Sequence, residues 1–88
     1  MKKVTNWENV SFTIASDYRK KILTNLENPK IPSNLSKELN INKAHISRAL
    51  KELEGKNMIK CLTPDSNKGK LYIISGYGKS ILKKIKKL

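Results

Sequence analysis

Hydrophobic residues recur at helical spacing in three separate stretches of the first two thirds of the chain. These stretches are residues 17–27, 32–39 and 43–56. Apolar side chains three or four positions apart are typical of a helix with one face turned towards a core. Ser16 and Asn42 are suitable N-cap residues, and Pro32 fits a first helical position, where its missing N–H has no partner anyway. The pattern therefore predicts three consecutive helices.

The apolar positions also identify a candidate core. The residues expected to face inward are Tyr18, Ile22, Leu23, Leu26, Leu35, Leu39, Ile46, Ala49, Leu50 and Leu53. Between the second and third helices stands the three-residue turn 40–42, in which Ile41 would fill the gap. We expect Asn40, and Asn57 after the third helix, to adopt the left-handed conformation that ends a helix. A short helix, a tight turn and a longer amphipathic helix form a helix-turn-helix.

The remaining sequence predicts a hairpin and one more helix. Residues 58–63 and 71–74 are expected strands, and residues 64–70 between them are dense in turn formers. Ser75 is expected to cap a last helix that runs to about residue 88. Its apolar side comprises Tyr77, Ile81, Leu82, Ile85 and Leu88. The sequence thus predicts one domain over residues 1–88, mainly α with a small β-hairpin: a winged helix-turn-helix.

Residues 7–14 allow two interpretations. Trp7, Val10, Ile14 and Tyr18 fall at helical spacing, whereas Val10, Phe12 and Ile14 alternate as in a strand. We favour the helix because the helical series continues to Tyr18.

The net positive charge of the chain is concentrated in its second half. The 19 Lys and Arg residues outnumber the 7 Asp and Glu residues, for a net charge of +12. Residues 43–88 hold 12 of the basic and 3 of the acidic side chains, a net of +9. Such an excess attracts a polyanion, which could be a nucleic acid or an anionic membrane.

The chain offers little catalytic or metal-binding chemistry. It has one cysteine, Cys61, and one histidine, His45, and no phosphate-binding glycine loop. We therefore expect no enzyme activity, no cofactor and no metal. Cys61 lies in an apolar stretch and is expected to be a buried structural thiol in a cytoplasmic protein. Neither a secretory signal nor a membrane-spanning stretch is recognisable, so we expect no membrane partner.

The polar side of the helix over residues 43–56 carries the candidate binding residues. At its N-terminal end we expect base contacts, because that end meets base edges when such a helix enters a major groove. The predicted DNA-binding residues of this helix are Asn42, Lys43, Ala44, His45, Ser47, Arg48 and Lys51. Lys68, Gly69 and Lys70 in the wing, residues 64–70, are expected on the flanking backbone or minor groove.

Three runs of the sequence, in this order and spacing, resemble winged helix-turn-helix regulators of the MarR and ArsR type, and small archaeal regulators most of all. The runs are NLSKELNI at residues 34–41, ISRALKELE at 46–54 and LYIISGYG at 71–78. The family usually has Gly at positions 40 and 57 and Thr at 75, but Asn and Ser keep the turn and cap chemistry. The paired cysteines of the metal-sensing members are missing here.

The resemblance implies a sequence-specific transcription regulator that binds double-stranded DNA as a homodimer. The alternative is a winged-helix module that binds RNA or protein in transcription or translation machinery. Three interpretations of the lysine-rich last helix remain open: it docks on its own domain, pairs with a partner's helix, or lies on a membrane. We favour pairing, with residues 1–15 and 76–88 as the dimerisation segments.

Overall fold

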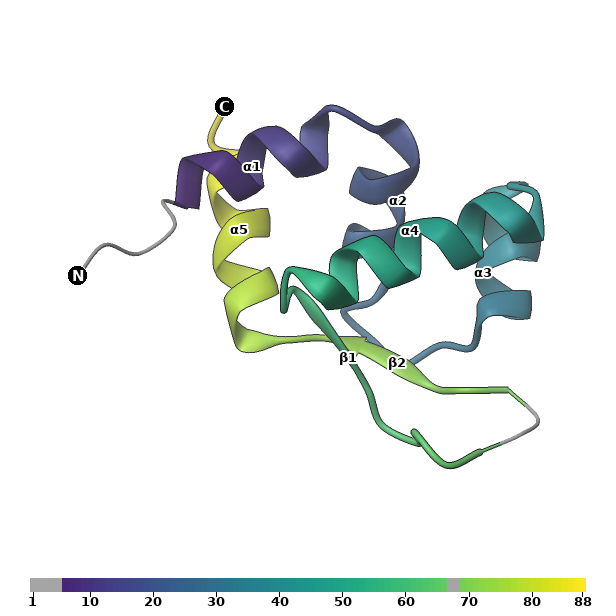
Figure 1. The fold of residues 1–88 in the computed structure, drawn as a ribbon. Helices are drawn as coiled ribbons and strands as arrows, with labels where there is room; N and C mark the ends of the chain where they lie inside the picture. The colour runs from purple at the N-terminus through teal and green to yellow at the C-terminus, as the bar shows by residue number, and fades with distance from the viewer. Residues whose placement is uncertain (1–5, 67–68) are drawn as a thin grey trace.

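A computed structural model describes residues 6–66 and 69–88. Within these ranges the chain forms five helices and one two-stranded antiparallel sheet (Figure 1). The elements are α1 (Asn6–Ile14), α2 (Asp17–Asn25), α3 (Pro32–Leu39), α4 (Lys43–Gly55), β1 (Ile59–Cys61), β2 (Tyr72–Ile74) and α5 (Gly76–Lys86). Helices α1 and α5 lie together at one end of the molecule and α3 at the other, while the hairpin projects away from the helices (Figure 1).

One hydrophobic core joins all five helices to the base of the hairpin. Its fully buried side chains include Ile22, Leu23, Leu26, Leu35, Ile46, Leu53, Met58 and Ile81. Most of the predicted core residues are buried, and Leu39 is half-buried. Tyr18 is the exception, because its side chain remains 39% exposed. It lies in the first turn of α2, beyond the reach of the core, and the prediction that it faces inward is wrong.

The predicted helix boundaries rest on caps and turns that the structure confirms. The side-chain oxygens of Ser16, Asn42 and Ser75 each accept a hydrogen bond from a backbone N–H in the first turn of α2, α4 and α5. Asn40 and Asn57 adopt left-handed backbone conformations, with φ of 57° and 63°. Asparagine tolerates this region better than most residues, and it leads the chain out of α3 and α4 as expected.

Some elements are shorter than predicted. Helix α2 ends at Asn25, and the free carbonyl of its C-cap residue, Leu26, accepts the backbone N–H of Ile74 at 2.9 Å. The paired strands cover only three residues each, with Ile59 opposite Ile74 and Cys61 opposite Tyr72. The first rung of the sheet, Ile59 and Ile74, is therefore buried in the core and hydrogen-bonded to the end of α2.

Residues 7–14 are helical, and the alternative strand interpretation is wrong. Val10 and Thr13 of α1 are buried, and the side-chain amide of Asn9 donates a hydrogen bond to the hydroxyl of Tyr77 on α5, at 2.5 Å. The Thr13 hydroxyl donates to the Asn9 carbonyl at 2.8 Å. Helix α1 thus packs on α5 of its own chain, and its buried polar groups have the partners that burial requires.

The apolar side of α5 serves the same core. Ile81, Leu82 and Ile85 are all buried, and Tyr77 is half-buried. Docking on its own domain, one of the three open interpretations of this helix, is therefore what the structure shows. Of the predicted apolar residues of this helix, only Leu88 stays exposed.

Arg19 connects three helices through one guanidinium group. Its Nε lies 3.0 Å from a carboxylate oxygen of Glu52 on α4, and its Nη1 donates to the carbonyl of Phe12 on α1 at 2.7 Å. The guanidinium carbon also stands 3.9 Å from the centre of the Phe12 ring, a cation–π contact. The Arg19 side chain is mostly shielded from water, which strengthens these charge-assisted hydrogen bonds.

Gly78 lets the start of α5 pack closely against Met58, just before β1, and against Ile74 at the end of β2. A Cβ atom at this position would lie 2.0 Å from the carbonyl oxygen of Met58 and 2.8 Å from a side-chain carbon of Ile74. The Met58 carbonyl cannot move away freely, because it already accepts the backbone N–H of Ser75 at 2.9 Å. Only glycine fits this approach of α5 to the root of β1.

Replacing Arg19 with Met should lower the free energy of unfolding by about 1.5–3 kcal/mol, because hydrogen bonds to charged groups contribute this much when they are shielded. The matched control is Lys21→Met, since Lys21 lies on the same helix in an exposed ion pair with Asp17 at 3.9 Å. That change should cost about 0.5 kcal/mol or less. Urea denaturation followed by circular dichroism measures both. Equal losses in the two variants would refute the role of Arg19.

Gly78→Ala should destabilise the protein by about 1–3 kcal/mol, the usual range for a methyl group forced into a filled site. Gly76→Ala, two residues earlier, is the control because a Cβ atom there meets nothing within 4 Å. It should leave stability unchanged or raise it by about 0.4–1 kcal/mol through the unfolded state. Thermal and urea unfolding of the two variants compare them directly, and a stable Gly78→Ala protein would contradict the close approach described above.

Candidate nucleic-acid interface

Helix α4 is held at a fixed angle by α3 and by the turn between them. Ile41 in this turn is buried between the two helices, as predicted. The backbone N–H of Ile41 donates to the Ser36 carbonyl at 3.1 Å, and the Ser36 hydroxyl donates to the Ile41 carbonyl at 2.6 Å. Two reciprocal hydrogen bonds and a buried side chain leave this helix-turn-helix little freedom to change its angle.

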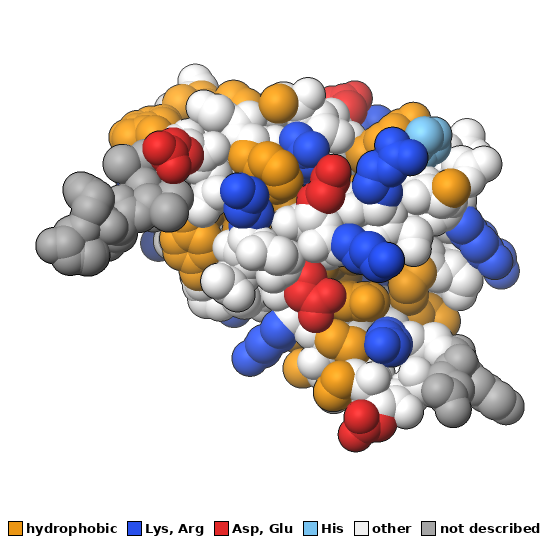
Figure 2. Space-filling view, in the orientation of Figure 1, with side chains coloured by type: hydrophobic (Ala, Val, Ile, Leu, Met, Phe, Trp, Pro, Cys, Tyr) orange, Lys and Arg blue, Asp and Glu red, His pale blue; other side chains and the backbone are white. Residues whose placement is uncertain are grey.

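The structure brings the predicted residues of α4 together on one exposed face. Every one of them has an exposed side chain: Asn42, Lys43, Ala44, His45, Ser47, Arg48 and Lys51. The opposite side of the helix is buried by Ile46, Ala49, Leu50 and Leu53. Because the buried side is packed into the core, the polar side has to point outward. Figure 2 shows Lys and Arg side chains over this region, with acidic side chains among them.

Charge is unevenly distributed along α4. Lys43 and Arg48 are exposed in its first two turns and Lys51 in its third, whereas Glu52 and Glu54 lie towards its C-terminal end. The ion pair with Arg19 compensates the carboxylate of Glu52, which would otherwise repel an anion near the basic residues. The first two turns of α4 are therefore the part that best attracts phosphate groups.

The wing extends this surface away from the helices. Gly69 and Lys70 are exposed, and Gly69 has a φ of 136°, a conformation that favours glycine. Lys68, the third residue predicted to contact DNA here, lies outside the described residues. The hairpin is closed by hydrogen bonds between the Leu62 N–H and the Leu71 carbonyl at 2.7 Å, and between the Leu71 N–H and the Thr63 hydroxyl at 3.0 Å.

A groove of about 250 Å³ lies between α2 and the first turns of α4. Its lining residues are Ser16, Tyr18, Arg19, His45, Arg48, Ala49 and Glu52. The rings of Tyr18 and His45 stand with their centres 4.9 Å apart and their planes tilted by 30°. Two predicted DNA-binding residues, His45 and Arg48, thus share a concave surface with a neighbouring helix.

The sequence interpretation missed the contribution of α2 to this surface. Tyr18 fits the apolar period of its helix, so the pattern alone assigned it to the core. Arg19 stands on the polar side of that helix, with no signal that it pairs with a carboxylate 33 positions away. Neither role has a local signature, because both depend on where α2 crosses α4.

Cys61 is less buried than the sequence predicted. Cys61 is half-buried rather than buried, because β1 leaves the core at this residue and continues towards the tip of the wing. Burial raises the pKa of Tyr72, its partner in the sheet, and the nearby Glu54 carboxylate raises it further, so the phenol stays protonated at neutral pH.

Within residues 6–66 and 69–88, no three His, Cys, Asp or Glu side chains are grouped so that they could hold a metal ion. In the same part of the chain, no helix combines the length and the apolar character needed to cross a bilayer.

Solved structures share this arrangement, whereas two comparisons by sequence give no match. No family model matches the chain, and no curated protein sequence matches it significantly. Among solved structures, a MarR family transcription regulator superposes with a TM-score of 0.75 at 20% identity, over 93% of this chain and 56% of that one.

Two further structures come from named bacteria. A MarR mutant from Escherichia coli complexed with operator DNA has a TM-score of 0.74 at 19% identity, over 94% of this chain and 64% of that one. Reduced HlyU from Vibrio cholerae has a TM-score of 0.75 at 19% identity, over 94% of this chain and 84% of that one. The likeness to archaeal regulators thus stays a prediction.

This chain spans a little more than half of the first of these proteins and about two thirds of the second. At such low identity the likeness concerns the fold. It confirms that residues 6–66 and 69–88 adopt the winged helix-turn-helix fold found in MarR regulators.

Proposed function

We propose that this protein is a transcription regulator that binds double-stranded DNA, with α4 in the major groove. The observation that carries the proposal is the exposed face of α4, a helix held rigidly by its neighbours. Asn42, Lys43, His45, Ser47 and Arg48 gather at the N-terminal end of this face, and Lys51 lies about one turn further along it. A single helix presented in this way has the width that the major groove of B-form DNA admits. The corresponding groove of duplex RNA is too narrow for side chains to read.

Affinity and selectivity should come from different residues. Lysines neutralise phosphates and release counterions, so they supply salt-dependent binding to any sequence. Arg48 stands one turn into α4 with an exposed guanidinium, which can donate two hydrogen bonds to the O6 and N7 atoms of a guanine. Asn42 and His45 lie beside it at the start of the helix and complete the proposed reading surface.

The wing is proposed to contact DNA beside the major groove. Lys70 is exposed two residues before β2, next to Gly69 with its positive φ. A lysine there suits a phosphate or the edge of the minor groove rather than a particular base. The wing would therefore add affinity and fix the orientation of the protein on the duplex.

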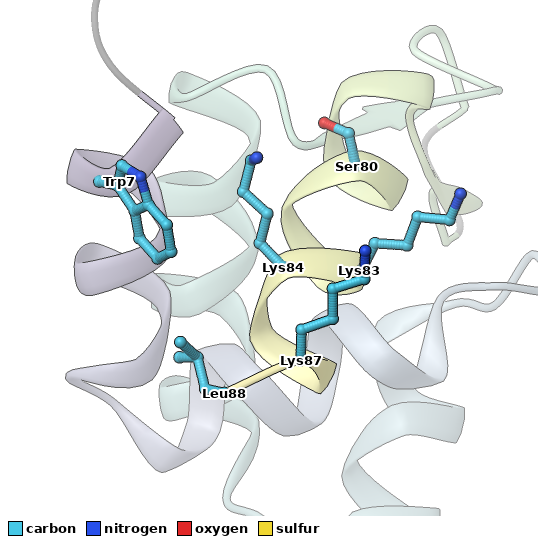
Figure 3. A pocket seen from close by; sticks show the side chains of 6 residues that line it. All are labelled: Trp7, Ser80, Lys83, Lys84, Lys87 and Leu88. Carbon is cyan, nitrogen blue, oxygen red and sulfur yellow. The ribbon is translucent and has the colours of Figure 1, made fainter.

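We further infer that two copies of the chain bind together through the face formed by α1 and the end of α5. Trp7 is 57% exposed and Leu88 is 70% exposed, and the two side chains line the same groove, so they belong to one apolar surface rather than to isolated positions. They border a groove of about 370 Å³ between the two helices, in which the Lys84 ammonium lies 5.8 Å from the centre of the Trp7 ring (Figure 3). A two-fold contact uses the same patch on both copies and would cover it.

Sequence-specific binding is tested with two sets of duplexes: those that the wild-type protein selects from a random pool, and scrambled versions of them. The dissociation constant of each protein variant for both sets is measured at several salt concentrations. Arg48→Ala should weaken binding to the selected sequence by about 1–3 kcal/mol and affect the scrambled one much less. Lys70→Ala should weaken both equally and lower the salt slope by about one unit. If Arg48→Ala lost the same free energy on both duplexes, the proposed base contact would be wrong.

To test pairing, sedimentation equilibrium measures the mass of the wild-type protein at micromolar concentration. Trp7→Lys should weaken self-association by about tenfold or more, since a buried tryptophan is often a dominant contact of an interface. Leu62→Lys is the control, because Leu62 is also an exposed apolar residue, 44% accessible, but lies on the hairpin. A wild-type protein that remains monomeric, or equal weakening by both changes, would contradict the assigned face.

A further inference from the structure

Tyr18 and His45 form a ring pair on the surface that is proposed to read DNA. Their ring centres are 4.9 Å apart, within the distance at which aromatic rings attract each other. Tyr18 is exposed to 39%, so burial in the core does not account for its position. Its hydroxyl has no hydrogen-bond partner within the described residues. What it does contact is the one imidazole of the chain.

The His45 side chain can hold one rotamer only if another side chain packs against its ring. It lies in the first turn of α4 with its side chain exposed, and an exposed side chain exchanges rotamers freely. A ring against one of its faces favours the rotamer that keeps the contact. A reading group held in its bound position before DNA arrives loses less conformational freedom on binding.

The other residues of the groove leave this pair undisturbed. The guanidinium of Arg19 is engaged by Glu52 and by the Phe12 carbonyl, so it is not available to the imidazole. Ala49 has only a methyl group and offers the rings no polar partner, and Arg48 lies next along α4 on the same groove. The described part of the chain shows no ion pair of Arg48, whose charge remains available to a ligand.

We propose that Tyr18 is a positioning residue, which holds the His45 imidazole at the entrance of α4 and thereby sharpens the choice of DNA sequence. This inference rests on the proposed function, and it adds α2 to a reading surface otherwise confined to the helix-turn-helix and the wing. Tyr18 acts through His45. It is the ring that matters, and the hydroxyl does not take part.

Two variants of Tyr18 separate the ring from the hydroxyl. Tyr18→Phe keeps the ring and should preserve the ratio of affinities for the selected and scrambled duplexes. Tyr18→Leu removes the ring and should reduce that ratio by about two- to tenfold, the range expected for the loss of one aromatic pair. In a His45→Ala background, Tyr18→Leu should have no further effect, because its only route to the DNA is gone.

A measurement on the free protein tests the ring pair without DNA. The carbon-bound protons of the His45 imidazole should shift in the NMR spectrum when Tyr18 is changed to Leu, and much less when it is changed to Phe. Thermal unfolding of the same variants checks that both remain folded, as expected for an exposed position.

Each other result has a definite meaning. An equal loss of discrimination in Tyr18→Phe would place the effect in the hydroxyl, as for a phosphate contact, and overturn the proposal. A loss that persists in the His45→Ala background would do the same. A selective wild-type protein whose discrimination survives Tyr18→Leu would overturn this proposal alone. A wild-type protein that prefers no duplex would overturn the proposed function as well.

Discussion

The packing of α2 across α4 is the contact on which the rest of this structure depends. It brings the buried Ile22 and Leu23 of α2 into one core with the apolar side of α4, and the ion pair between Arg19 and Glu52 joins the two helices. Because α4 cannot rotate without exposing that apolar side, the direction of its polar side is fixed by burial. The same crossing decides which residues of α2 stand beside the first turn of α4. The core and the candidate binding surface are therefore two sides of one helix contact.

Local patterns were sufficient for most of the fold. The helical period, the caps at Ser16, Asn42 and Ser75, and the left-handed Asn40 and Asn57 are each determined within a few residues of the chain. The exposed face of α4 followed directly from its buried face. These features were predictable because short-range hydrogen bonding and periodic burial have sequence signatures.

Features that join distant segments were not predictable in this way. Leu26 fits the helical period, yet its carbonyl serves the sheet, and α2 ends earlier than its pattern suggests. Tyr18 has the residue type and spacing of a core position, yet the crossing of two helices leaves it beside His45. The apolar side of α5 suggested a partner, but its own chain already buries it through α1 and the hairpin root. In each case the deciding neighbour is tens of residues away.

The isolated bridge between Lys30 and Tyr72 has a mechanical consequence. The backbone N–H of each residue donates to the carbonyl of the other, at 3.0 and 2.9 Å, so the connection between α2 and α3 adds one rung to the outer side of β2. At Tyr72, β2 is thus hydrogen-bonded on both edges, to β1 on one side and to the segment that leads into the helix-turn-helix on the other. The Lys30 rung therefore ties the base of the wing directly to the start of α3 by backbone hydrogen bonds, so the wing and the helix-turn-helix are positioned relative to each other without any side chain taking part.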